Sequence, residues 1–200
     1  MISKDKLNEY KEKRDFDKTA EPDGKAREKM KNRFVIQQHD ASNMHYDFRI
    51  EMDGILKSWA VPKGPSTDHK EKRLAMLTED HPLDYAGFEG TIPEDEYGGG
   101  TIIVWDAGTY ENLREEKEDK SIEKSYEEGK IEIWLKGKKL TGGYLLIKTG
   151  KDGKRWLLKK MDDEEADARR KPLKTEPESV LSGNTIEQMK KKMKSSSSGD

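Results

Sequence analysis

Between residues 45 and 52 the chain alternates strictly between ionisable and apolar side chains. The ionisable members are His45, Asp47, Arg49 and Glu51, and an aromatic or aliphatic residue follows each of them. Successive side chains of a strand point to opposite faces of a sheet. The stretch therefore predicts a strand with one face against a hydrophobic core and the other lined by an imidazole, carboxylates and a guanidinium.

Short apolar or alternating runs bounded by turn-forming residues recur along the middle of the chain. They predict roughly eight strands. The nine candidate runs are residues 33–38, 44–52, 55–61, 72–80, 101–106, 109–111, 130–135, 144–148 and 155–161. Asp53-Gly54 is a hairpin turn signal, and Ala107-Gly108 is interpreted as a turn between two strands. Because no strand–helix repeat occurs, we expect an all-β fold with minor helix, an antiparallel sandwich or a compact barrel.

Charge-rich segments flank this predicted body of residues 33–161. Residues 1–32 are rich in charge with few large apolar side chains and predict a solvated arm, with a short polar helix over residues 3–14. Residues 112–128 are interpreted as a helix or a mobile loop. Residues 162–200 predict a largely disordered tail with a brief helix over 185–194.

The composition limits both the core and the chemistry. Hydrophobic residues make up 31% and charged residues 40%, so a single core cannot engage the whole chain of 200 residues. The absence of cysteine excludes disulfides, zinc–thiolate sites and thiol catalysis. A net charge of −2 argues against bulk coating of nucleic acid but allows a local basic region. With no apolar run of membrane-spanning length and no signal peptide, we expect a soluble, cytoplasmic protein.

The polar face of the strand at residues 44–52 carries a candidate metal site. His45 and Asp47 share that face, and His39 returns to it if the chain turns at Ser42 and Asn43. Two imidazoles and a carboxylate leave coordination positions open, as a catalytic metal requires. Imidazole suits zinc and later transition metals, whereas carboxylate and water suit manganese and magnesium.

Other polar residues are candidates for phosphate chemistry. Arg49 would present a planar donor fork beside the metal. His81 follows a predicted strand and precedes a proline, where an imidazole can protonate a leaving oxygen or bind a phosphoryl oxygen. Tyr85 is interpreted as either a nearby phenol or a core residue. The Gly98–Gly100 run lacks the patterns of nucleotide-phosphate loops.

Four ordered blocks of sequence resemble the 3′-phosphoesterase domain family of DNA ligase D. The first is residues 38–49, which end in His-Tyr-Asp-Phe-Arg, and the second is residues 53–66, Asp-Gly-Ile-Leu-Lys-Ser-Trp-Ala-Val-Pro-Lys-Gly-Pro-Ser. The third is residues 79–85, Glu-Asp-His-Pro-Leu-Asp-Tyr. The fourth joins Phe88-Glu-Gly-Thr-Ile-Pro-Glu to Tyr97-Gly-Gly-Gly. The match extends from about Arg14 to Met161.

The resemblance implies a β-barrel that binds one divalent metal, typically manganese (Mn2+). The family's metal ligands fall on His39, His45 and Asp47. Its catalytic and phosphate-contacting residues fall on Arg49, His81 and Tyr85. Supporting basic residues fall on Lys63 and Arg73, which the residue pattern alone assigns to solvated faces.

The resemblance also gives the N-terminal segment a role. The family's essential arm residues fall on Arg14, Asp15 and Glu21, and Ala20 stands where a proline often precedes the Glu-Pro pair. Composition and resemblance agree if the arm of residues 1–32 is mobile without substrate and folds over the site when a 3′ end binds. Arg14 would then meet a phosphate, and the carboxylates would hold the metal or a 2′-hydroxyl.

The activity implied by the resemblance is the healing of DNA 3′ ends. The family removes the nucleoside of a 3′-terminal ribonucleotide and then the remaining 3′-phosphate, which leaves a 3′-hydroxyl. Substrates would be DNA or RNA-tipped DNA 3′ ends, and we expect a stand-alone monomer that works with a separately encoded ligase, since no Lys-x-Asp-Gly adenylation motif occurs. The alternatives are a non-catalytic, metal-dependent binder of nucleic-acid ends and a small-molecule phosphohydrolase.

Overall fold

The computed structural model describes residues 6–24 and 31–197. Within these ranges the strands are β1 Arg33–Asp40, β2 Met44–Met52, β3 Ile55–Val61, β4 Lys72–Leu77, β5 Gly90–Ile92, β6 Gly100–Asn112, β7 Lys130–Gly137, β8 Thr141–Lys148 and β9 Arg155–Lys160. The helices are α1 Asn8–Glu12, the 3-10 helix η1 Leu83–Gly87, α2 Leu113–Glu118, α3 Ile122–Glu127, α4 Pro172–Thr175 and α5 Ile186–Ser197.

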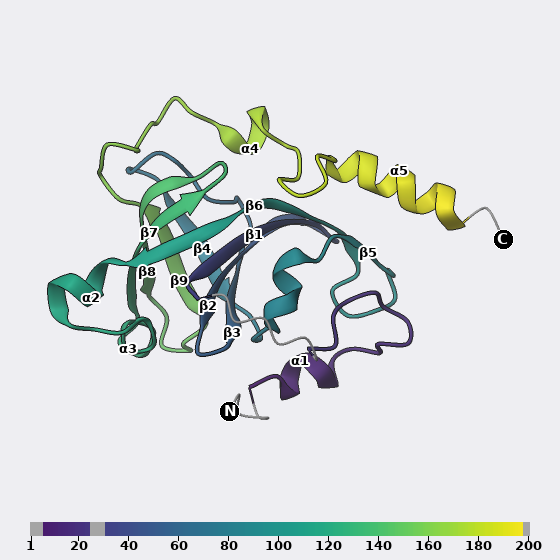
Figure 1. Cartoon of the computed structure of the whole chain (residues 1–200), viewed down its shortest axis with the longest axis horizontal. Helices are drawn as coiled ribbons and strands as arrows, with labels where there is room; N and C mark the ends of the chain where they lie inside the picture. The colour runs from purple at the N-terminus through teal and green to yellow at the C-terminus, as the bar shows by residue number, and fades with distance from the viewer. Residues whose placement is uncertain (1–5, 25–30, 198–200) are drawn as a thin grey trace.

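The strands form one antiparallel sheet that closes on itself. Its order is β1-β2-β3-β4-β9-β8-β7-β6, and β6 pairs in turn with β1 (Figure 1). The short strand β5 pairs with the beginning of β6 and lies outside the ring. A closed barrel of eight antiparallel strands with a few short helices confirms the predicted all-β fold and selects the barrel over the sandwich.

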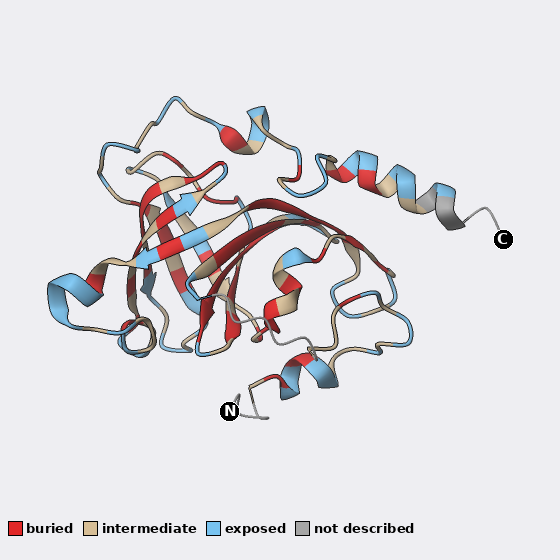
Figure 2. Ribbon diagram, in the orientation of Figure 1, coloured by how far each residue is buried: buried red, intermediate tan, exposed pale blue. Residues whose placement is uncertain are grey.

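The apolar face of β2 lies inside the barrel, as its alternation predicts. Phe48 and Ile50 pack there with Phe34 and Ile36 of β1 and Trp59 of β3. Burying a side chain of this size contributes about 1.5–3 kcal/mol, so the interior fixes which face of β2 points outward. Figure 2 shows the buried residues following the barrel strands, whereas most of α2 is exposed.

A second hydrophobic cluster lies on the outer face of the barrel. Val35 of β1 and Val104 of β6 form it together with Leu83 and Tyr85 of η1 and Tyr10 of α1. This cluster attaches η1 and the N-terminal segment to the wall that carries the outward-facing polar row of β2. The segment 6–24 is thereby packed against the barrel, and its mobility in the absence of substrate stays a prediction.

Two local predictions are wrong for a physical reason. Ala107-Gly108 is no turn, because β6 continues through it and Gly108 pairs with both Phe34 of β1 and Gly137 of β7. A Cβ on Gly108 would collide with the carbonyl oxygen of Lys136, so the glycine serves the close approach of strands. The strand predicted over 72–80 ends at Leu77, and the following residues form the loop that leads to η1.

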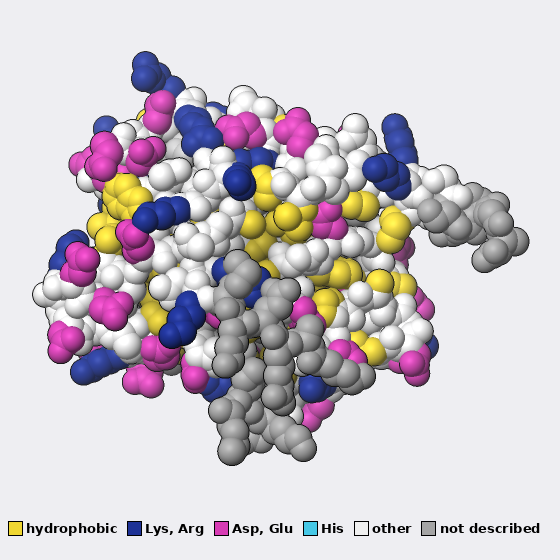
Figure 3. Space-filling view, viewed as in Figure 1, with side chains coloured by type: hydrophobic (Ala, Val, Ile, Leu, Met, Phe, Trp, Pro, Cys, Tyr) yellow, Lys and Arg dark blue, Asp and Glu magenta, His cyan; other side chains and the backbone are white. Residues whose placement is uncertain are grey.

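Two short helices occupy the charge-rich segment 112–128. Asn112 accepts a hydrogen bond from Arg114 N and begins α2, and Ser121 caps α3 in the same way. Helix α1 is shorter than the helix predicted over residues 3–14, of which residues 3–5 lie outside the described ranges. No helix in the described part of the chain is both long and apolar enough to span a membrane. Figure 3 shows acidic and basic side chains interspersed over one face of the molecule.

The predicted disorder of residues 162–200 stays a prediction, and the described part of this segment contacts the barrel. The carbonyl oxygen of Glu176 accepts hydrogen bonds from the indole of Trp105 at 2.8 Å and from the ammonium group of Lys139 at 2.7 Å. Both donors belong to the barrel, and Trp105 is fully buried. The segment therefore docks through its backbone, a property that a composition of charged residues does not reveal.

Helix α5 adds a small apolar contact to this docking. Ile186 and Met189 on one side of α5 pack with Ile103 of β6 as a separate cluster. Lys190 of the same helix forms an ion pair with Asp40, the last residue of β1. The helix predicted over 185–194 is present, and the structure holds it against the barrel.

Candidate active site and metal centre

The β1–β2 hairpin brings three potential metal ligands together. His39 and His45 are paired across the hairpin, with ring centroids 4.7 Å apart. Asp47 lies two residues further along β2 on the same face, with Oδ1 3.6 Å from His45 Nε2 and Oδ2 3.7 Å from His39 Nδ1. One ligand atom of each residue lies within 4.8 Å of the others. The three residues singled out in the sequence thus converge in space.

The donor set fits a divalent metal. The carbonyl oxygen of Asn43 lies 2.9 Å from His45 Nδ1, so that nitrogen donates and the lone pair of Nε2 remains on the side of Asp47. His39 Nε2 is buried and has no hydrogen-bond partner among the described residues. Two imidazoles and one carboxylate leave positions open for substrate oxygens, and this mixed set admits manganese as well as zinc.

Arg49 is the centre of the polar row. Its Nε donates to Gln37 Oε1 at 2.7 Å, and its Nη2 donates to Asp47 Oδ2 at 3.0 Å. The side chain is buried, and the guanidinium lies over the ring of Tyr85. Burial alone would raise the pKa of Asp47, but the charge of Arg49 and the bond from His39 hold that pKa well below its usual value. The carboxylate is therefore ionised and available to a metal.

His81 lies between two guanidinium groups. It is held by an isolated bridge to Leu56 of β3, and its Nδ1 lies 2.9 Å from the carbonyl oxygen of Glu79. Arg49 Nη1 lies 3.0 Å from the same nitrogen, and Arg14 Nη2 lies 3.4 Å from Nε2. Burial and these two positive charges hold the pKa of His81 well below its ordinary value. The imidazole is therefore neutral near pH 7.

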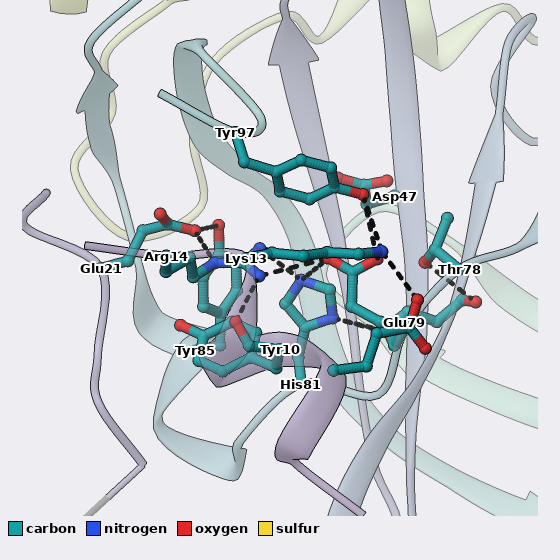
Figure 4. A network of polar contacts seen from close by, with 12 residues as sticks. Tyr10, Lys13, Arg14, Glu21, Asp47, Thr78, Glu79, His81, Tyr85 and Tyr97 are labelled. Carbon is teal, nitrogen blue, oxygen red and sulfur yellow. Dashed lines mark hydrogen bonds and ion pairs between the residues drawn. The ribbon is translucent and has the colours of Figure 1, made fainter. Parts of the chain in front are cut away.

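The N-terminal segment closes one side of this network (Figure 4). Arg14 Nε donates to Glu21 Oε1 at 2.8 Å, and both terminal nitrogens lie 3.3 Å from Glu79 Oε1. The hydroxyl of Tyr85 donates to the same Glu21 oxygen at 2.9 Å. Burial and the charge of Glu21 raise the pKa of Tyr85 well above its usual value, so the phenol stays protonated. Arg14, Glu21, His81 and Tyr85 thus belong to one buried constellation.

Three other residues from the sequence analysis lie apart from it. Asp15 is exposed and pairs with Lys18 within the same segment at 3.3 Å. Lys63 is exposed in the turn after β3, and Arg73 of β4 pairs with Glu71. No hydrogen bond or ion pair found among the described residues joins these three to the network. Their predicted roles stay predictions.

The structure adds polar residues that the sequence reasoning missed. Gln37 fixes Arg49 and donates through Nε2 to the carbonyl oxygens of Tyr85 and Phe88, both at 3.0 Å. Glu79 accepts from Arg14 and, at 3.3 Å, from the hydroxyl of Tyr97. A signal was present for both, because Gln37 stands two residues before His39 and Glu79 two before His81, the spacing of side chains on one face of an extended chain.

Comparison with known proteins gives a consistent result. The sequence profile of the "DNA Ligase D 3'-phosphoesterase domain" matches residues 37–148. The multifunctional non-homologous end joining protein LigD of Pseudomonas aeruginosa is 48% identical over 193 residues, which cover 93% of this chain and 22% of that protein. The protein of the same name from Mycolicibacterium smegmatis is 44% identical over 162 residues, covering 80% of this chain and 21% of its own length.

A third relative, the multifunctional non-homologous end joining DNA repair protein LigD of Mycobacterium tuberculosis, is 43% identical over 162 residues. The chain spans about a fifth of the length of these curated relatives. The profile nevertheless covers the hairpin with His39, His45 and Asp47, the loop with His81 and most of the barrel. On this evidence, the chain belongs to the DNA ligase D 3′-phosphoesterase domain family.

Proposed function

We propose that this protein is a manganese-dependent phosphoesterase that heals DNA 3′ ends in two steps. The first step removes the nucleoside of a 3′-terminal ribonucleotide and leaves a 3′-phosphate. The second step removes that phosphate and leaves a 3′-hydroxyl, the group that a DNA ligase joins. The observation that carries the proposal is the convergence of His39, His45 and Asp47 beside the guanidinium of Arg49.

The metal ligands and the phosphate-contacting residues have different roles in the proposed reaction. A divalent ion held by His39, His45 and Asp47 would polarise a phosphoryl oxygen and orient a hydroxyl or water. Arg49 stabilises the charge that develops on the other phosphoryl oxygens, because its fork is fixed by Gln37 and Asp47 before substrate arrives. Positioned donors of this kind are typically worth about 10²–10³ in rate.

His81 acts as a neutral hydrogen-bond partner of the phosphate. A neutral imidazole between Arg49 and Arg14 can donate to or accept from a phosphoryl group without adding a third positive charge. Tyr85 holds Glu21 and lies under Arg49, so it orients both groups. Arg14 meets the phosphate from the side of the arm, and Lys63 and Arg73 serve the more distant backbone of the nucleic acid.

The N-terminal arm serves the nucleoside step most. Asp15 joins the site when a 3′ end is bound, together with Arg14 and Glu21, and contacts the terminal ribose. In the diester step water attacks the phosphorus, and the 5′-oxygen of the terminal nucleoside leaves as a hydroxyl, which yields the 3′-phosphate. The 2′-hydroxyl of that nucleoside serves as a contact for the arm residues.

Two matched duplexes test this function. One ends in a single 3′-ribonucleotide and the other in a 3′-phosphate, and each is incubated with full-length protein in the presence and absence of manganese. We expect conversion of both to 3′-hydroxyl ends only with the metal. Binding of both ends without turnover would favour the non-catalytic end-binding protein, and hydrolysis of a mononucleotide in preference to the duplex would favour a small-molecule phosphohydrolase.

A further inference from the structure

The loop of residues 93–99, between β5 and β6, carries an exposed aromatic side chain beside the candidate active site. The ring of Tyr97 belongs to a residue that is 47% exposed, although its hydroxyl donates to the buried Glu79 at 3.3 Å. The other large apolar side chains exposed in the described part of the chain are aliphatic: Met44, Leu74, Ile147 and Leu181. Tyr97 therefore combines an anchored hydroxyl with an aromatic surface open to solvent.

Glycines fix this loop against the strand that carries a metal ligand. A Cβ on Gly99 would lie 2.6 Å from the carbonyl oxygen of Pro93, so the loop can close only without a side chain there. Gly100 has a φ of 141°, and a Cβ on it would collide with the carbonyl oxygen of Asp40, the neighbour of His39. The glycine run therefore holds the loop that carries Tyr97 close to the end of β1.

The N-terminal arm lies against the ring of Tyr97. Lys13 Nζ is 4.8 Å and the Arg14 guanidinium carbon 5.4 Å from the ring centroid. Figure 4 shows Tyr97 on one side of Lys13 and Arg14, with His81 and Tyr85 on the opposite side. A second link between arm and loop is the ion pair of Lys18 with Glu96 at 3.5 Å. Cations against a ring stabilise it in place and leave its remaining surface for another π system.

We propose that Tyr97 is a substrate-binding residue on whose ring the base of the 3′-terminal nucleoside stacks during nucleoside removal. This inference rests on the proposed function and names the part of the substrate that this side of the site recognises. A base within a duplex is stacked on both faces, whereas a terminal base has one face free for an aromatic side chain. Stacking of this kind tolerates any base, because every base has a π face.

The geometry assigns Tyr97 to the leaving nucleoside. Arg49 and His81 hold the phosphate in both steps, so the base on its 3′ side and the base on its 5′ side occupy different places. Tyr97 contacts the arm residues Lys13 and Arg14, and the arm is the segment that the nucleoside step needs. Once the nucleoside has left, no base remains on that side. Tyr97 should therefore change the ratio of the two rates.

The kinetic test compares Tyr97→Ala with two matched variants. Tyr97→Phe keeps the ring and loses the hydroxyl, and Leu181→Ala removes an exposed apolar side chain elsewhere. We expect the ratio of ribonucleoside removal to phosphate removal, each as kcat/KM, to fall by about tenfold in Tyr97→Ala and to be kept by the other two. On a primer whose terminal ribose has no base, Tyr97→Ala and the wild type should show the same ratio. A tenfold gap that persists without the base would overturn the stacking role.

A binding test remains informative even if the protein turns over neither substrate. A duplex with 2-aminopurine as its 3′-terminal base is bound in the presence of a chelator, and stacking on Tyr97 quenches the fluorescence of that base. We expect quenching with wild type and Tyr97→Phe and its loss with Tyr97→Ala. Equal quenching by wild type and Tyr97→Ala would refute the stacking of the base on Tyr97. Absent turnover with normal quenching would count against the proposed chemistry alone.

Discussion

Two regions bring charge to the same site by different means. In β2, the backbone of His45, Asp47 and Arg49 pairs with β1. Asp47 and Arg49 also pair with β3 on the other side, and Phe48 packs in the core between them. The arm of residues 6–24 is mostly irregular, and its Arg14 and Glu21 are held by ion pairs and by a small outer cluster. Side chains on a strand are held in position before substrate binds. Side chains held by exchangeable ion pairs can change partners when substrate binds.

The largest effect is expected from a change to the metal ligands on β2. His45→Ala removes one of two imidazoles and should lower manganese affinity at least about 100-fold and abolish turnover on both substrates. Calorimetry with manganese and product analysis on both duplexes measure these effects. His69→Ala is the matched control, since His69 lies elsewhere and faces Asp162 at 3.6 Å. Undiminished manganese binding by His45→Ala would remove His45 from the ligand set.

A variant of Arg49 distinguishes phosphate contact from metal binding, because Arg49 lies on the same strand as His45 and Asp47 but is no metal ligand. An arginine does not coordinate a cation, so Arg49→Ala should keep manganese bound while phosphate removal falls by about 10²–10³. Equilibrium metal binding and single-turnover rates measure the two quantities in one preparation. The exposed Arg155→Ala controls for loss of a positive charge. Loss of the metal together with Arg49 would show that the two roles are not separable.

The arm should act on one step more than on the other. Arg14→Ala breaks the contacts with Glu21 and Glu79, and we expect the ratio of ribonucleoside removal to phosphate removal to fall by about tenfold. Deletion of residues 1–24 should move the ratio in the same direction. The control is Lys11→Ala, an exposed residue of the same arm. A ratio equal to that of wild type in both arm variants would leave the arm without a step-specific role.

The C-terminal segment resembles the arm in composition and should affect stability rather than chemistry. Removing residues 162–200 leaves Trp105 and Lys139 without the carbonyl partner that Glu176 provides, at roughly 1–3 kcal/mol for each buried donor. A domain of this size should then melt at least about 4 °C lower. Differential scanning calorimetry measures the shift, with a truncation after Ser195 as the control. A melting temperature unchanged by the long truncation would restore the prediction of a solvated tail.

The sequence predicted those parts of the site that follow strand periodicity. The alternation around Phe48 indicated both the barrel wall and the face that carries Asp47, because a strand with one apolar face has a single permitted register. It did not indicate Tyr97, since loop geometry sets the position of that side chain. Gly108 was misread because a close strand approach and a turn both require glycine.

The charged segments were the hardest to interpret. Arg14 and Glu21 come from a stretch without periodicity, and only the resemblance to a family placed them in the site. The docking of Glu176 through its backbone carbonyl carries no side-chain signal at all. Composition measures how much apolar surface a segment can bury. These segments are held by ion pairs and backbone hydrogen bonds together with a few apolar side chains, Tyr10 in the arm and Ile186 and Met189 in α5.

The most direct test of the whole account is a time course on one duplex that ends in a single 3′-ribonucleotide. With manganese, the wild-type protein should convert it first to the 3′-phosphate and then to the 3′-hydroxyl. Arg14→Ala should slow the first conversion about tenfold relative to its conversion of an added 3′-phosphate duplex. Direct appearance of the 3′-hydroxyl with no 3′-phosphate intermediate, or equal slowing of both steps by Arg14→Ala, would contradict the division of labour between strand and arm.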